Sequence, residues 1–165
     1  MLRPSRKVVV SGLAVILVLD VSSAFIHPFG AVKHQNSPRP LLSGSSITPE
    51  ALRIITRSCQ NCHSEKTEWP WYSYVAPTSW LLERDVSRAR SRMNLSHWDE
   101  YPSQRRFVLL KEIPVMVGRR RMPPSRYLLM HPNAKLSDTE VKEITRWARA
   151  EGQRYAPRQT PTAGE

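Results

Sequence analysis

The chain contains two cysteines, and both stand in the motif Cys59-Gln60-Asn61-Cys62-His63. Four kinds of chemistry use thiols at this spacing: a disulfide, a thioredoxin-like redox pair, a structural zinc site and covalent attachment of haem. A disulfide here would close a small, strained loop with little entropic gain. A thioredoxin-like pair usually accompanies a βαβ pattern, which the sequence lacks. Zinc requires four ligands, and the remaining plausible candidates show no paired spacing: His34, His97 and His131.

Haem attachment is the interpretation that the motif favours, because CxxCH is the recognised spacing for c-type haem. Two thiols three positions apart on a helical turn can each add to one vinyl group of a porphyrin. The next residue then presents an imidazole to the iron. Cys59 and Cys62 are therefore predicted to hold one covalently bound haem c, with His63 as the proximal iron ligand.

The sixth iron position has several candidate ligands in the sequence, of which Met122 is preferred. Met122 begins the segment Met122-Pro123-Pro124, where two prolines stiffen the backbone and keep the thioether outside a helix. A methionine opposite a histidine raises the reduction potential and suits electron transfer. His131 is the alternative, and a bis-histidine haem would have a lower potential. The other candidates include Met93 and Met116, which lie in apolar patterns typical of a core, and also His97 and Met130.

Aromatic residues follow the motif directly, in the segment WPWYSYVAPTSW. Trp69, Trp71 and Tyr72 are predicted to pack as a wall against the haem or to hydrogen-bond a haem propionate, and Tyr127 could share that role. The basic run from Arg119 to Arg121 could neutralise propionates, dock an acidic partner or form a solvated face.

The elements that must position these residues are predicted to be helices throughout. Thr48-Pro49-Glu50 is a helix entry signal, and the helix that follows ends at the cysteine motif. A second helix is expected after Pro77, with Leu82, Val86, Ala89 and Met93 on its inner face. A third is expected over Ser103–Ile113, stopped by Pro114 and followed by a further turn to Gly118. Ser137 and Glu140 form a capping box for the last helix. The predicted fold class is therefore all-α, a small cytochrome c-like helical domain around the haem, preceded by an N-terminal hydrophobic helix.

The N-terminus has the pattern of an export signal, with basic residues followed by the apolar run VVVSGLAVILVL. Residues 1–26 are predicted to be a signal peptide or an uncleaved transmembrane anchor over Val8–Ile26. The body of the protein would then lie on the periplasmic side of the bacterial inner membrane. Residues 27–47 are expected to be a linker, 48–152 the haem-binding domain and 153–165 a flexible tail.

The charge balance predicts anionic partners, because 25 Lys and Arg residues stand against 14 Asp and Glu in 165 residues. An acidic redox protein and an anionic membrane surface both fit this excess. No nucleic-acid-binding motif accompanies the basic residues, so nucleic acid is not expected as a partner.

The segments CQNCHSEKTEWPWYSYVAP and RMPPSRYLLMHPNAKLS, together with RMNLSHW and ITRWA, resemble the bacterial haem-binding domain family of short c-type cytochromes. The likeness covers roughly Pro49 to Ala150. It implies an exported, often membrane-anchored module in which Cys59 and Cys62 match the attachment cysteines, His63 the proximal ligand and Met122 the methionine of the MPP motif. The basic run before Met122 departs from the pattern expected of relatives.

The function expected from these residues is a single-electron carrier with His/Met haem ligation and no catalytic turnover. A haem-based sensor or gas-binding protein, and an accessory domain of a peroxidase-like system, are the alternatives. A membrane-tethered disulfide oxidoreductase without haem is a weaker one.

Overall fold

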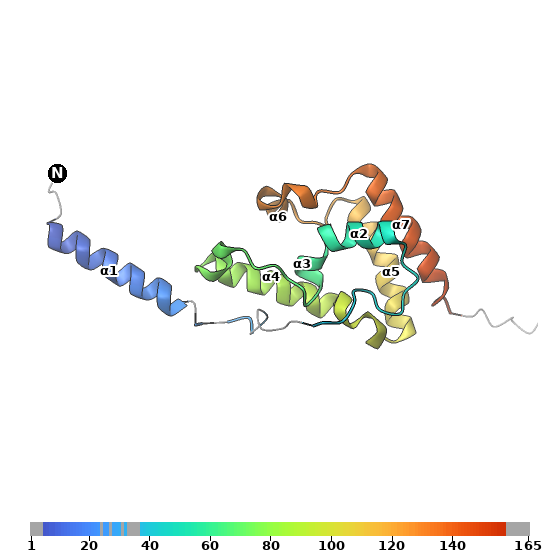
Figure 1. Ribbon diagram of the computed structural model, residues 1–165, viewed down its shortest axis with the longest axis horizontal. Coiled ribbons are helices and arrows are strands. Elements are labelled where there is room, and N and C mark those ends of the chain that lie inside the picture. Colours follow the sequence, from blue (N-terminus) through green and yellow to red (C-terminus); the bar gives the residue numbers. More distant parts are fainter. Residues whose placement is uncertain (1–4, 24, 27, 31, 33–36, 158–165) are drawn as a thin grey trace, which may run out of the picture.

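The computed structural model describes residues 5–23, 25–26, 28–30, 32 and 37–157 of the chain. Within these residues the regular secondary structure is entirely helical, which confirms the predicted all-α class (Figure 1). The elements in chain order are α1 (Arg6–Ser23), α2 (Pro49–Ser58), α3 (Gln60–His63), η2 (Trp71–Tyr74), α4 (Thr78–Arg92), η3 (Leu95–Glu100), α5 (Ser103–Gly118), α6 (Ser125–Met130), η4 (Pro132–Ala134) and α7 (Asp138–Gln153), where η marks a 3-10 helix.

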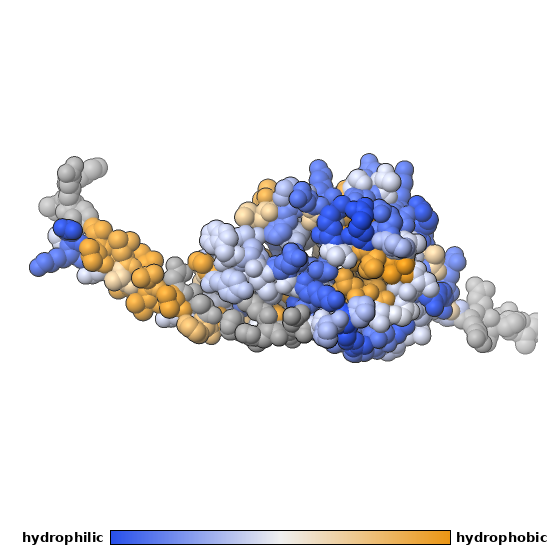
Figure 2. Space-filling model, in the orientation of Figure 1, coloured by the Kyte–Doolittle hydropathy of each residue, from blue (hydrophilic) through white to orange (hydrophobic). Residues whose placement is uncertain are grey.

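Helix α1 carries the N-terminal apolar run and has most of its side chains exposed (Figure 2). It is 18 residues long, which corresponds to about 27 Å at 1.5 Å per residue, and Arg6 and Lys7 occupy its first turn. Among the described helices, none combines the length and the apolar character required to cross a bilayer. The predicted transmembrane helix over Val8–Ile26 is therefore corrected.

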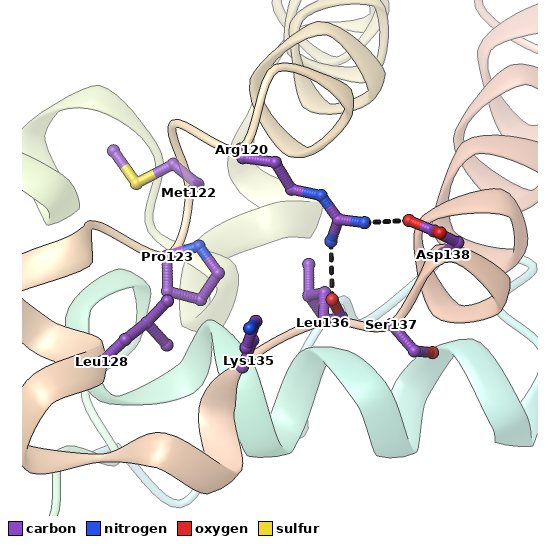
Figure 3. A pocket seen from close by; sticks show the side chains of 8 residues that line it. All are labelled: Arg120, Met122, Pro123, Leu128, Lys135, Leu136, Ser137 and Asp138. Carbon is purple, nitrogen blue, oxygen red and sulfur yellow. Dashed lines mark hydrogen bonds and ion pairs between the residues drawn. The ribbon is translucent and has the colours of Figure 1, made fainter.

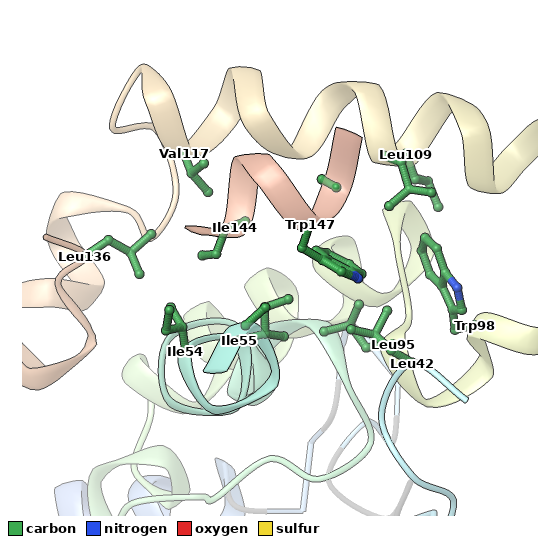
Figure 4. Packing of buried hydrophobic residues seen from close by; sticks show 13 residues of the cluster. Leu42, Ile54, Ile55, Leu95, Trp98, Leu109, Val117, Leu136, Ile144 and Trp147 are labelled. Carbon is green, nitrogen blue, oxygen red and sulfur yellow. The ribbon is translucent and has the colours of Figure 1, made fainter. Parts of the chain in front are cut away.

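The core of the domain lies where α2, α5 and α7 pack together. Figure 4 shows Trp147 of α7 in the middle of this cluster, between the isoleucines of α2 and Leu109 of α5. Trp147 is 3% exposed and Ile54 is fully buried. Because Cys59 directly follows α2, this core fixes the position of the cysteine motif.

The helix starts read from the sequence are confirmed for α2 and α7. Thr48 caps α2 by accepting a hydrogen bond from the Ala51 amide at 3.1 Å. Ser137 and Glu140 form the predicted capping box at α7, with distances of 3.2 and 2.9 Å for its two hydrogen bonds. These caps satisfy amides that the first helical turn leaves without partners.

The predicted stop at Pro114 is wrong, because α5 continues through this proline to Gly118. Proline lacks the amide hydrogen that would bond to the residue four positions earlier, so the helix loses one hydrogen bond there. Val117, one turn further on, is 4% exposed and belongs to the core. Its burial favours continuing the helix past the proline.

The inner face predicted for α4 is only partly confirmed. Val86 is buried as expected, but Glu83 and Arg90 are buried with it, whereas Leu82 and Ala89 are only half-buried. The buried face of α4 therefore differs from the predicted apolar face and includes two charged residues, Glu83 and Arg90.

Part of the segment expected to be a linker packs onto the domain. Leu42 is 1% exposed within the core cluster, and its amide donates to the Leu95 carbonyl at 2.9 Å. Arg39 forms ion pairs with Asp99 and Glu100 of η3. Residues 37–47 thus contribute to the folded unit, although their sequence has no periodic apolar pattern.

His97 of η3 joins two glutamates and should make stability depend on pH. Its Nε2 lies 2.8 Å from Glu65 Oε1 and its Nδ1 lies 3.0 Å from Glu100 Oε2. The hydrogen bonds with Glu100 and Glu65 raise the pKa of His97 above its ordinary value of 6.5. A raised folded-state pKa gives stabilisation that is fully present below the unfolded pKa and lost as the pH rises through the folded one.

We therefore expect His97→Gln to lower the free energy of unfolding more at about pH 5.5 than at about pH 8.5. The loss at the acidic pH should be no more than about 1 kcal/mol, because the pair is partly exposed. Urea unfolding of both proteins at the two pH values measures the difference. A loss that is equal at both pH values would contradict a role for the charged imidazole.

Candidate functional site

The cysteine motif lies at the junction of α2 and α3. Cys59 ends α2, with its amide bonded to the Ile55 carbonyl, and α3 carries Cys62 and His63. Both thiols are free of disulfide bonding. Burial raises the pKa of Cys59 to about 12, with a further rise from Cys62, and raises the pKa of Cys62 to about 11.

These raised pKa values bear on the alternatives left open by the motif. Thiol–disulfide exchange is carried out by thiolates, and redox-active cysteines have lowered pKa values. Protonated, half-buried thiols therefore do not fit the disulfide oxidoreductase. Among the described residues, no group of three or more His, Cys, Asp or Glu side chains could hold a metal ion. His34, a candidate for the zinc site, lies outside the described residues.

His63 is held in one orientation by the end of α4. Its Nδ1 lies 3.0 Å from the carbonyl oxygen of Met93, and because a carbonyl only accepts, Nδ1 must carry the proton. Burial lowers the pKa of His63, so the imidazole is neutral at neutral pH. The lone pair on Nε2 is left for a metal, in the arrangement by which proteins orient histidine ligands.

The loop after the motif folds back onto α3 through side-chain hydrogen bonds. Thr67 Oγ1 donates to the Asn61 carbonyl at 2.6 Å, Ser64 Oγ donates to the Gln60 carbonyl at 2.9 Å, and the Glu68 amide donates to Asn61 Oδ1 at 3.1 Å. These bonds make the motif and the loop one rigid unit.

Arg90 of α4 holds this loop through hydrogen bonds. It was not among the residues singled out from the sequence. Its guanidinium donates to the carbonyls of Ser64 and Val32 at 2.8 and 2.9 Å, and to Thr67 Oγ1 at 2.9 Å. Burial lowers the pKa of Arg90. The only signal in the sequence is its helical spacing from Val86, which places a charged residue on the buried face.

Tyr127 of α6 contacts the cysteine motif through its hydroxyl. Its hydroxyl accepts a hydrogen bond from Asn61 Nδ2 at 3.2 Å. Burial raises the pKa of Tyr127, and the thiol groups of Cys62 and Cys59 and the Tyr72 phenol contribute to the rise. Tyr72 and Tyr127 therefore lie in the same region as the two cysteines, as expected for residues that pack around one bound group.

The remaining aromatic candidates occupy different environments. Tyr72 and Trp71 form an edge-to-face pair with ring centroids 5.8 Å apart, and burial raises the pKa of Tyr72. Trp71 is 79% exposed, while Trp69 is half-buried just before η2. Only part of the predicted wall is thus packed within the protein itself.

The two candidates for the sixth ligand differ in their surroundings. The ring of His131 stacks on Tyr127 at 4.3 Å between centroids and 18° between planes. Met122 lies half-buried in the loop between α5 and α6. With Pro123 and Leu128 it lines a cavity of about 520 Å³, and Figure 3 shows its thioether directed away from Arg120 and Asp138. The Met122 thioether therefore makes no contact with those polar groups. The stack leaves the ring nitrogens of His131 open, and its buried Nδ1 has no hydrogen-bond partner among the described residues.

A second link fastens α6 to the site. Arg126 of α6 forms an ion pair with Asp85 of α4 at 2.9 Å, and both charges influence the pKa of Cys62. Neither residue was predicted from the sequence, because a pair 41 positions apart leaves no local pattern. This ion pair therefore holds α6 against α4, close to Cys62 of the motif.

These elements define a cytochrome-like haem-binding protein: an all-helical domain that presents two thiols and an oriented neutral imidazole where α2 meets α3. Residues 18–150 match the model of the family described as the haem-binding domain. The match covers most of the chain, and the protein belongs to this family.

One curated relative shows a more distant likeness. The chain is 29% identical over 115 residues to cytochrome c peroxidase Ccp of Escherichia coli (strain K12). This alignment covers 63% of the chain but 23% of the relative, so the likeness concerns a minor part of that larger protein. No solved structure matches the chain.

The residues present fit a haem. The hydrogen bond of His63 Nδ1 to the Met93 carbonyl fixes the ring, so that Nε2 is the nitrogen that could ligate iron. Burial raises the pKa values of the two motif thiols, so both are protonated at neutral pH. Imidazole and thioether groups ligate the iron of c-type cytochromes, and the thiols of a CxxCH motif attach the haem. Tyr72 and Tyr127 supply aromatic surface in the same region.

Proposed function

We propose that the protein is an exported single-electron carrier that holds one haem c. Cys59 and Cys62 attach it through thioether bonds, in which each sulfur bonds to one vinyl carbon and the thiol hydrogen goes to the other. His63 and Met122 ligate the iron. The bound haem would supply reversible one-electron chemistry, and His/Met ligation favours a raised reduction potential.

The observation that carries this proposal is the hydrogen bond from His63 Nδ1 to the Met93 carbonyl at 3.0 Å. It fixes the tautomer and the ring orientation, so that Nε2 is presented as a ligand without any rearrangement. A preorganised ligand suits electron transfer, in which the protein should move little. The side-chain hydrogen bonds of Asn61 and Thr67 add to this rigidity.

The location and the partner are part of the same proposal. The basic and apolar N-terminal pattern supports export to the periplasmic side of the inner membrane. The formal net charge of +11 supports an acidic redox protein as partner, because opposite charge steers encounter. Tyr72 and Tyr127 are proposed to pack against the haem, and Trp69 and Trp71 to complete the wall.

A second candidate function is an accessory electron-relay domain of a peroxidase-like system. The similarity to cytochrome c peroxidase Ccp favours it. The candidate retains the same His63 and Met122 ligation, and it differs only in the protein that the electron reaches.

The test uses the full chain matured with haem c and compares it with Met122→Ala. We expect a low-spin spectrum with the near-infrared methionine–iron band, unchanged by carbon monoxide, and loss of the band in Met122→Ala. Met130→Ala is the matched control, because Met130 is 63% exposed, and it should keep the band.

Three results would change the assignment. A high-spin or readily carbonylated haem in the unmodified protein would favour a sensor or a catalytic role over the carrier. A methionine–iron band that survives Met122→Ala would transfer the sixth position to another methionine. A low-spin haem that lacks the band in the unmodified protein and becomes high-spin in His131→Ala would transfer it to His131.

A further inference from the structure

The basic run before Met122 contains three arginines that do not behave alike. Arg120 Nη1 donates to the Leu136 carbonyl at 2.5 Å, and Arg120 Nη2 forms an ion pair with Asp138 Oδ1 (Figure 3). Arg119 and Arg121 are exposed and form no ion pair with the part of the chain that the structure describes. The central arginine therefore has a structural partner that its two neighbours lack.

The loop that carries Met122 has few other attachments. The amides of Arg121 and Met122 both donate to the Met116 carbonyl, at 3.0 and 3.3 Å. Arg120 itself has a φ of +55°, in the left-handed region that residues with a side chain seldom occupy. Such a conformation persists only where surrounding interactions hold it.

The partners of Arg120 lie beside the core and at the start of α7. Leu136 is 4% exposed and is part of the core cluster, and Asp138 is the first residue of α7. The guanidinium therefore connects the Met122 loop to the start of a helix whose other face packs in the core. The side chain crosses the wall of the cavity that Met122 also lines.

We propose that Arg120 is a positioning residue for Met122. Its two contacts hold the loop in one conformation, so that the thioether stays at the sixth position of the iron instead of leaving it. The inference rests on the proposed function, because it requires Met122 to be the ligand.

The experiment titrates the full chain, matured with haem c, with exogenous imidazole and follows the loss of the near-infrared methionine–iron band. A loop that samples other conformations competes less well for the iron, so imidazole should bind more tightly. We expect Arg120→Gln to raise the apparent imidazole affinity about tenfold. Arg119→Gln and Arg121→Gln are the matched controls, since each removes one charge from the same run, and they should change it less than about twofold.

Asp138→Asn is the second variant, because the Asp138 side chain is 89% exposed and its replacement leaves the core intact. It removes the ion pair but keeps the bond to Leu136, so we expect an affinity about threefold higher. If Arg120→Gln does not fold, Asp138→Asn decides the question, and an unchanged affinity in that variant overturns the proposal.

The other results are equally decisive. If Arg120→Gln folds and binds imidazole as the two control variants do, Arg120 has only a structural role and the proposal is overturned, whatever its stability in urea. If Met122→Ala keeps the band, the ligand assignment fails and the Arg120 proposal fails with it. Loss of the band in Met122→Ala with no effect of Arg120→Gln overturns the positioning role alone.

Discussion

Replacing both motif cysteines by serine should abolish the retention of haem by the denatured chain. Cys59 and Cys62 are the chain's two cysteines, so the double variant can form no thioether bond. Mass spectrometry of the purified, acid-denatured protein should show the chain alone, whereas the unmodified protein should carry the mass of one haem. The expected effect is complete, because a covalent bond survives unfolding and ligation by His63 does not.

The single variants Cys59→Ser and Cys62→Ser are the controls for this prediction. Each keeps one thiol at the junction of α2 and α3 and should retain haem through one bond, at reduced yield. Haem that remains on the denatured double variant would show attachment elsewhere and contradict the site. An unmodified chain without haem mass, after expression with the maturation machinery, would contradict covalent attachment altogether.

Trp147→Ala should cost more stability than any surface substitution in the domain. The indole is 3% exposed at the centre of the packing between α2, α5 and α7 (Figure 4). Removing a buried tryptophan side chain costs about 3–5 kcal/mol, because transfer free energy is lost and a cavity remains. This loss is a large part of the free energy of unfolding of a typical domain, which is about 5–15 kcal/mol.

Urea unfolding followed by far-ultraviolet circular dichroism measures this loss. Arg149→Ala is the matched control on the exposed side of the same helix, and it should change the free energy of unfolding by no more than about 0.5 kcal/mol. A loss below about 1 kcal/mol for Trp147→Ala would mean that the three helices do not share one core.

The features of the fold that could be predicted from the sequence are those with local causes. Thr48 and Ser137 predict where α2 and α7 begin, because a capping side chain bonds to an amide within three residues. Pro114 misleads because its local penalty is outweighed by the burial of Val117, which depends on distant packing. Leu42 enters the core without any periodic pattern around it, because segments distant in the sequence, η3 among them, pack around it.

The candidate site divides in the same way. The chemistry proposed for Cys59, Cys62 and His63 was predicted from their types and spacing, and the family match supports haem binding. The groups that hold them do not follow from the sequence, because Arg90 joins segments up to 58 positions apart. A pattern of residue types can propose a ligand, whereas its orientation is decided by contacts between segments.

The main-chain oxygen that accepts from His63 has a consequence for which substitutions this site can tolerate. The acceptor is the carbonyl of Met93, and every amino acid has this group, so substitutions at position 93 can accumulate without removing the bond. A carbonyl also has no protonation equilibrium in the physiological range, unlike the carboxylates that orient histidines elsewhere. The orientation of the imidazole therefore depends neither on the side chain at position 93 nor on the protonation of its acceptor. Under the proposed ligation, substitutions at Met122 should change the reduction potential more than substitutions at Met93.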